Sequence, residues 1–208
     1  SARPCPEKRH DRSASGRRRR GNDWQLRPTR DFDEGDLRRM WAYYAGAVSY
    51  VDHCLGLLLE ALVDTGQFDD TLFIFTSDHG EMLGDHNLWR KTYAYEASAR
   101  VPFIIKLPSS MKGPRNRKIT NLVGWEDIMP TFLDVAGASI PSQVEGKSLL
   151  PLLLGGDSPS REYYHGEHSP CYHPENANQF LTDQTWKYIW NPITGKEQLF
   201  DISNDPEE

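Results

Sequence analysis

The sequence predicts an α/β fold with a small antiparallel β subdomain at its C-terminal end. Three observations support this prediction: a long amphipathic helix near the start, an alternation of helix, strand, loop and strand in the middle, and a run of short strands at the end. Alternating helices and strands are typical of α/β domains, whereas consecutive short strands favour an antiparallel sheet. At 208 residues the chain could form one domain or a piece of a larger one.

A helix is expected over residues 36–65. Its apolar side chains recur at steps of three and four residues, which places them on one stripe of an amphipathic helix; they are Leu37, Met40, Trp41, Tyr44, Val48, Val51, Leu55, Leu58, Leu59 and Leu62. Asp36 is a suitable N-cap and Gly66 a suitable residue just past the end. Asp52 and His53 are interpreted as polar residues at the helix edge rather than as metal ligands.

Two apolar runs, at residues 71–76 and 101–107, are expected to form strands, the first of them buried. Asp78 and His79 follow the first run directly and precede a glycine. Ligands bind at the carboxyl ends of strands in open α/β sheets, so this pair marks a candidate site. The alternative is that Asp78 forms a turn or caps a helix and that His79 is an ordinary polar residue.

The alternation continues through the middle of the chain. A polar loop at residues 109–117 leads to an expected short strand at 118–123 and then to a helix at 126–136. Pro130 lies early enough in that helix to be tolerated. Residues 146–151 are expected to pack rather than to react.

The last quarter of the sequence is predicted to be an antiparallel sheet. A loop rich in Pro, Asn and His is expected at residues 169–178. Short strands surround it; they are expected at residues 161–167, 179–182, 186–190 and 198–201.

The net charge of −6 conceals an asymmetry along the chain. Residues 1–30 carry ten Lys or Arg and three Asp or Glu, whereas the rest carries 14 and 27. This basic end has few apolar residues, so it is interpreted as a disordered or non-native leader, and nucleic-acid binding is not predicted. No apolar run reaches the ~18–20 residues of a membrane span, so none is predicted. The cellular compartment and the oligomeric state stay open.

Asp78, His79 and Lys91 are the main candidates for chemistry. By residue type alone, the carboxylate and the imidazole suit zinc, manganese or calcium equally. Lys91 follows His79 by twelve residues, and its ammonium group can bind a sulfate or phosphate oxygen. Arg90 is the alternative to Lys91 in the neighbouring register.

Three further histidines, His86, His165 and His168, are candidate substrate contacts. On a strand, His165 and Glu167 would share one face. The His165–His168 segment lacks the helical spacing of an HExxH zinc motif. The alternative for these residues is a plain surface or subdomain contact.

The stretch F-T-S-D-H-G-E-M-L-G-D-H-x-L-W-x-K, followed by Y-E-A-S-A-R-V-P-F-I-I, resembles the late metal-binding motif of the sulfatase family, within the alkaline-phosphatase-like superfamily. Later segments, D-I-M-P-T-F-L-D-V-A-G and W-K-Y-I-W-N-P, are similar to those of the same family. The resemblance implies part of a sulfatase-like α/β sandwich over residues 34–155 and an incomplete C-terminal β subdomain over residues 156–208, after a leader at residues 1–33.

The same resemblance implies a chemistry. Asp78 and His79 would bind calcium, ahead of magnesium or manganese, with further ligands from upstream in the full protein. Lys91 would contact the sulfate group of a small-molecule or carbohydrate sulfate ester.

The nucleophile of the family is missing from this sequence. Sulfatases use formylglycine, made from Cys or Ser in a C/S-x-P-S/A-x-R context, and the nearest candidate, Cys5, has its proline at the wrong place. The expected function is therefore that of a sulfatase fragment, inactive alone. The alternatives are a phosphodiesterase or phosphonate monoester hydrolase of the same superfamily, or a non-catalytic remnant.

Overall fold

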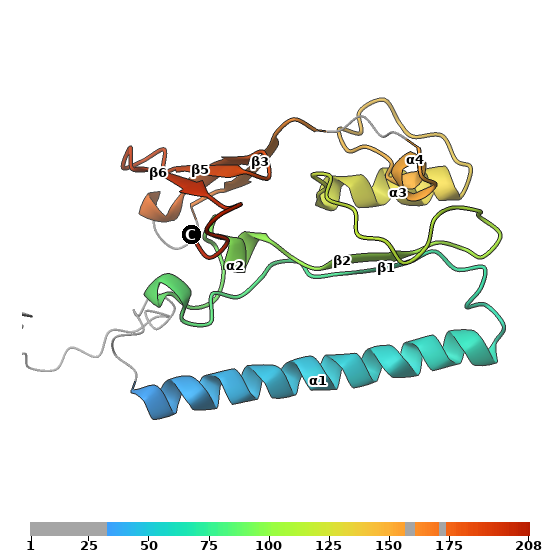
Figure 1. The fold of residues 1–208 in the computed structure, drawn as a ribbon, viewed down its shortest axis with the longest axis horizontal. Coiled ribbons are helices and arrows are strands. Elements are labelled where there is room, and N and C mark those ends of the chain that lie inside the picture. The colour runs from blue at the N-terminus through green and yellow to red at the C-terminus, as the bar shows by residue number, and fades with distance from the viewer. Residues whose placement is uncertain (1–32, 157–160, 171–173) are drawn as a thin grey trace, which may run out of the picture.

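The computed structural model describes residues 33–156, 161–170 and 174–208. Its centre is a two-stranded sheet of β1 (Phe73–Thr76) and β2 (Phe103–Lys106), and its C-terminal end is a four-stranded antiparallel sheet (Figure 1). This arrangement confirms the predicted α/β class with a small antiparallel C-terminal sheet. The predicted leader lies outside the described residues, apart from Asp33.

The first helix, α1 (Glu34–Asp64), begins two residues before its predicted start. Asp33 rather than Asp36 is the N-cap, because the Asp33 carboxylate accepts a hydrogen bond from the Asp36 amide at 2.8 Å. None of the helix residues is buried. Figure 1 shows α1 running alongside the β1–β2 pair. A hydrogen bond from Trp41 Nε1 to the Leu83 carbonyl, 2.8 Å long, joins its first third to the loop that follows β1.

By length and composition, α1 is also long and apolar enough to cross a membrane. No membrane span was predicted because the sequence has no long uninterrupted apolar run. The 31 residues of α1 include polar side chains that interrupt such a run, although the helix is apolar on average. The core helix of a soluble protein passes the same test. The absence of a membrane span therefore stays a prediction.

The two central strands pair antiparallel, with Phe73 opposite Lys106 and Thr76 opposite Phe103. Each strand is shorter than its predicted run, and the residues of β1 are half-buried rather than buried. Within the described residues the pair has no third strand beside it, so the apolar side chains of β1 are only partly covered.

The segment between the two sheets is helical and irregular. The predicted strand at residues 118–123 is wrong: no described strand pairs with this segment, and a strand needs such a partner for its backbone groups. The predicted helix at residues 126–136 is a 3₁₀ turn (Trp125–Asp127) followed by α3 (Ile128–Val135), with Pro130 in its first turn. A short helix, α4 (Leu150–Leu153), continues the segment that was expected to pack.

The C-terminal sheet has the order β3–β4–β5–β6, and every neighbouring pair is antiparallel. Its strands are β3 (Tyr164–His168), β4 (Asn178–Thr182), β5 (Trp186–Trp190) and β6 (Glu197–Asp201). Side chains alternate along β5: Lys187 and Ile189 are buried, whereas the three aromatic residues between and beside them are exposed. The buried face of this sheet therefore faces the rest of the chain.

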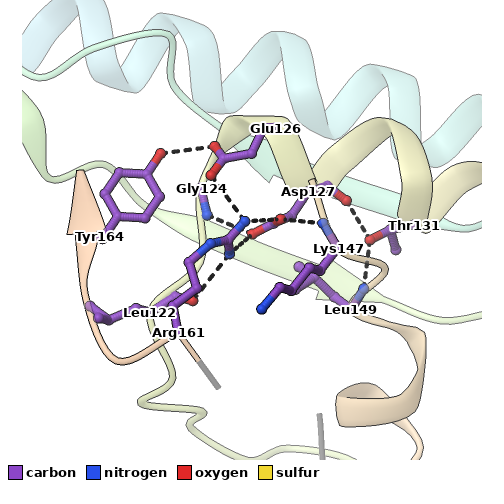
Figure 2. A network of polar contacts seen from close by, with 9 residues as sticks. All are labelled: Leu122, Gly124, Glu126, Asp127, Thr131, Lys147, Leu149, Arg161 and Tyr164. Carbon is purple, nitrogen blue, oxygen red and sulfur yellow. Dashed lines mark hydrogen bonds and ion pairs between the residues drawn. The ribbon is translucent and has the colours of Figure 1, made fainter. Parts of the chain in front are cut away.

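A buried carboxylate, Asp127, lies where α3 meets the start of the C-terminal sheet (Figure 2). Both of its oxygens accept hydrogen bonds from the Arg161 guanidinium at 2.6 Å, and the amides of Gly124 and Lys147 donate to it at 2.9 and 2.8 Å. Burial alone would raise the pKa of the Asp127 carboxyl, but these hydrogen bonds outweigh burial and hold the pKa below its ordinary value.

The same network reaches the strand that follows. Arg161 also pairs with Glu126 at 3.0 Å, and the Tyr164 hydroxyl donates to the Glu126 carboxylate at 2.9 Å. The strand β3 begins at Tyr164 and not at residue 161 as predicted, because its pairing with β4 begins with Tyr164 opposite Thr182. The network thus joins α3 to the C-terminal sheet.

Candidate functional site

Asp78 and His79 lie just past the end of β1, as the sequence predicts. Their side chains point together: Asp78 Oδ2 is 3.4 Å from His79 Nε2. The side chain of Asp78 is 77% exposed and that of His79 is 38% exposed, so a ligand from solvent can reach both.

The hydrogen bonding of His79 suits a metal ligand. His79 Nδ1 lies 2.7 Å from the carbonyl oxygen of Gly80. In the neutral ring Nδ1 then carries the proton, which leaves the Nε2 lone pair facing the Asp78 carboxylate. A proton or a metal ion between these two groups would make their contact favourable, and metal-bound histidines commonly donate their other ring N–H to a carbonyl.

The donor set fits a shared cation but does not complete its coordination. Calcium takes about six to eight ligands and zinc about four. Among the residues that the structure describes, no group of three or more His, Cys, Asp or Glu side chains gathers to hold a metal. A metal ion held by Asp78 and His79 would therefore need further ligands from elsewhere.

Two hydrogen bonds of Ser77 hold the backbone around Asp78. The Ser77 carbonyl accepts a hydrogen bond from Trp125 Nε1 at 3.0 Å, and Ser77 Oγ donates to the His79 carbonyl at 2.6 Å. Trp125 lies next to Glu126 and Asp127 of the buried network, so that network also fixes the backbone that carries Asp78.

Gly80 brings the Asp78–His79 turn against α2 (Glu96–Ala99), a short helix that the sequence did not predict. The amides of Gly80 and Glu81 donate to the carbonyls of Ser98 and Ala97 at 2.8 and 2.9 Å. A Cβ atom at position 80 would lie 2.0 Å from the Ala97 carbonyl oxygen. Only glycine permits this close approach.

Replacing Gly80 by alanine is expected to lower the free energy of unfolding by about 1–3 kcal/mol, because the added methyl must displace the α2 backbone. Chemical denaturation followed by circular dichroism measures the change. Gly46, within α1, has nothing within 4 Å of such a Cβ and serves as the control. Gly46→Ala is expected to stabilise the helix by about 0.5–1 kcal/mol, and equal effects of the two changes would contradict the close approach.

The loop after Gly80 is folded around a carboxylate. Glu81 accepts a hydrogen bond from the Arg90 amide, and the Met82 amide donates to the Arg90 carbonyl at 2.7 Å. Positive φ angles, which are uncommon outside glycine, gather in this loop; they occur at Leu83, His86, Asn87, Arg90 and Thr92. Lys91 lies between two of them and is exposed.

The structure places His86 away from the Asp78–His79 pair. Its ring stacks on Tyr95, with centroids 4.1 Å apart, and its Nε2 lies 3.3 Å from the Glu207 carbonyl. These contacts bind the loop to the end of the chain. A substrate contact by His86 remains a prediction.

The two histidines of β3 lie on opposite faces of the sheet. His165 and Glu167 are exposed on one face, as the alternation predicts, whereas His168 is half-buried on the other. Among the described residues His168 Nε2 has no hydrogen-bond partner although the atom is buried. The described contacts of these histidines do not include Asp78 or His79, and a role in substrate binding remains a prediction.

Sequence reasoning missed Trp125 and Glu96, the first residue of α2. Trp125 is 48 residues from its partner Ser77, and no local pattern marks such a pair. The glycine after Asp78 and His79 was a usable signal for the contact with α2, because a glycine in a turn can mark a place where another backbone segment approaches closely.

Comparison with known proteins places these features in a family. A family model described as Sulfatase matches residues 2–138, and one described as N-sulphoglucosamine sulphohydrolase, C-terminal, matches residues 84–208. An arylsulfatase of Clostridium perfringens is 43% identical over 173 residues, which cover 83% of this chain and 35% of that protein.

Two further similar proteins are named for other activities. An N-acetylglucosamine-6-O-sulfatase of Bacteroides thetaiotaomicron is 34% identical over 196 residues, covering 86% of this chain and 34% of that protein. The crystal structure of a phosphonate monoester hydrolase of Agrobacterium radiobacter superimposes with a TM-score of 0.74 at 30% identity, covering 86% of this chain and 38% of that one. The chain thus spans about a third of the length of these curated relatives.

Proposed function

This chain belongs to the sulfatase family, and we propose that it contributes the later half of a sulfatase active site, which hydrolyses a sulfate ester to an alcohol or phenol and sulfate. The observation that supports this most directly is the convergence of Asp78 Oδ2 and His79 Nε2 at the end of β1, with Lys91 on the loop that follows.

In this proposal Asp78 and His79 hold a divalent cation, with calcium the first choice because the family resemblance favours it over magnesium or manganese. When bound, such a cation neutralises charge on the sulfate group and orients it for attack. Asp78 contributes a carboxylate oxygen and His79 its Nε2, and the Gly80 carbonyl keeps the His79 ring in place. The remaining ligands, an Asp pair and the formylglycine, would come from parts of the protein outside these 208 residues.

Lys91 is proposed to stabilise the charge that develops on the leaving group. Its ammonium group is exposed, and within the described residues no ion pair engages it. A lysine held near a sulfuryl oxygen lowers the energy of the transition state electrostatically. His86, His165 and His168 are proposed as contacts to the alcohol or sugar part of the substrate.

The chain by itself is proposed to be inactive, because its sequence holds no Cys or Ser in the context that yields formylglycine. The full-length protein that carries this segment is therefore the object to assay. The alternative activity is phosphonate monoester hydrolysis, which the similarity to the Agrobacterium radiobacter enzyme supports. Both reactions use a metal and a tetrahedral oxyanion, so the same variants are informative for either one. Assaying them with a sulfate ester and with a phosphonate ester shows which reaction the protein catalyses.

Replacing Lys91 by methionine in the full-length protein is expected to lower kcat about 100–1,000-fold, because one charge-stabilising donor is lost. Initial rates with 4-nitrophenyl sulfate and with 4-nitrophenyl phenylphosphonate measure the effect, and the faster substrate identifies the reaction. Lys196→Met, in an exposed turn of the C-terminal sheet, is the matched control. Equal rates for Lys91→Met and the control would remove Lys91 from the mechanism.

A further inference from the structure

Lys187, on β5, is a buried cation far from the candidate site in sequence. The residue has no exposed surface, and its Nζ lies 2.8 Å from Glu96 Oε1 and 3.3 Å from Glu208 Oε1. Nζ also lies 5.2 Å from the centre of the Phe180 ring. An ammonium group removed from water in this way is stable only when it is paired, and here two carboxylates pair with it.

The two carboxylates crowd one ammonium. The side chain of Glu208 is 1% exposed, and its Oε1 is ion-paired with Lys187 but makes no hydrogen bond among the described residues. Burial, together with the charge of Glu96, raises the pKa of the Glu208 carboxyl although Lys187 acts in the opposite direction. A well-packed apolar group would avoid these desolvation costs, so stability alone is a weak reason for this arrangement.

This cluster holds the start of α2. The Glu96 amide donates to Glu208 Oε2 at 2.6 Å, while the Glu96 side chain pairs with Lys187. In the next two residues of α2, the carbonyls of Ala97 and Ser98 accept hydrogen bonds from the amides of Glu81 and Gly80. An unbroken series of contacts therefore runs from Lys187 through α2 to the turn that carries Asp78 and His79.

The same end of the chain also holds the loop that carries Lys91. The Glu207 carbonyl lies 3.3 Å from His86 Nε2 before Lys91, and Asn178 of β4 donates to the Thr92 carbonyl at 2.8 Å after it. We refer to Lys187, Glu207 and Glu208 as the C-terminal clamp. Lys91 is thus bracketed by residues that the C-terminal sheet and the clamp hold.

We propose that Lys187 is a positioning residue, which acts through Glu96 to fix α2 and thereby the backbone of the Asp78–His79 turn and of the Lys91 loop. The roles of those three residues rest on the proposed function, whereas the contacts that position them do not. The test is therefore made first on structure and only then on activity.

Amide hydrogen exchange of the 208-residue chain tests the proposal. In the Lys187→Met variant, the amides of Gly80 and Glu81 are expected to exchange about tenfold faster or more, because α2 no longer holds its position. Ile189→Ala is the matched control, since Ile189 is buried on the same face of the same strand and has no part in the cluster. It is expected to speed exchange in the C-terminal sheet and to leave the Gly80 and Glu81 amides near their original rates.

A second variant keeps the test decisive if Lys187→Met fails to fold. Glu96→Gln retains the shape of the side chain and removes the charge, and it is expected to speed the same two amides. The double variant is expected to match the stronger single variant, because both changes break one interaction. Additive effects, or equal acceleration of these amides by Ile189→Ala, would overturn the proposal.

In the full-length protein, Lys187→Met is expected to lower kcat with little change in KM, and Ile189→Ala to leave both near their original values. If the protein hydrolyses no sulfate or phosphonate ester, the proposed function fails while the exchange result still stands. If the amides of Gly80 and Glu81 are unaffected, the positioning role fails while the activity remains.

Discussion

Replacing Asp78 by alanine in the full-length protein is expected to abolish calcium-dependent sulfate release, with a loss of about a thousandfold or more, since a metal-bound charge contributes several kcal/mol to the transition state. Asp78 extends into solvent with its carboxylate facing His79 Nε2, so its removal leaves the imidazole as the only one of the two proposed ligands. Rates are measured over a calcium titration, so that a weakened site is distinguished from a lost one.

The control for this change is Asp70→Ala, an exposed aspartate just before the other end of β1. It is expected to retain full activity at the same calcium concentrations. Retained activity of the Asp78→Ala variant would remove Asp78 from the ligand set. A loss that excess calcium restores would instead reduce Asp78 to a supporting ligand.

The second large effect is on stability: Asp127→Ala is expected to lower the free energy of unfolding by about 3–5 kcal/mol, because it removes the fully buried one of the two carboxylates that pair with the Arg161 guanidinium. The side chain of Arg161 is only 15% exposed, and it would lose its ion pair with the fully buried Asp127 while keeping the one with the more exposed Glu126. Two backbone amides, those of Gly124 and Lys147, would also lose their acceptor. Urea denaturation of the 208-residue chain measures the change.

The pH dependence of stability provides a second test of the role of Asp127. The folded pKa of Asp127 lies below its ordinary value, so its contribution to stability is fully present above that ordinary pKa and is lost as the pH falls through the folded one. The stability difference between the wild type and Asp127→Asn is therefore expected to shrink below about pH 4. Asp205→Asn, an exposed aspartate, is the control, and a difference that stays constant into acid would contradict the assignment.

The parts of the fold that the sequence predicts well are those that depend on local pattern. The stripe of α1 repeats over many turns, and its predicted ends lie within two residues of the observed ones. The alternation along β5 is clear, and its predicted and observed bounds agree. The position of Asp78 and His79 at the end of β1 follows from one apolar run and one glycine. Each of these signals is contained within a few consecutive residues.

The parts that the sequence does not reveal depend on distant partners. The segment at residues 118–123 has the composition of a strand, but none of the strands that the structure describes lies beside it. Helix α2 has four residues, too few for a periodic pattern. Arg161 reaches Asp127 across 34 positions and Lys187 reaches Glu96 across 91, and no spacing rule marks either pair.

The left-handed residues of the loop between Leu83 and Thr92 determine whether this loop would keep its shape in another protein. Each such residue outside glycine costs about 1–2 kcal/mol in local conformational energy, so this segment would relax to another shape if it were free. Its shape is imposed by Glu81, by Tyr95 and by the C-terminal clamp, all of which lie outside it. Grafting these ten residues onto another α/β scaffold would transfer the lysine without its geometry. A segment that keeps the shape of this loop would therefore have to extend from β1 past the C-terminal sheet, so that it includes Glu207 and Glu208.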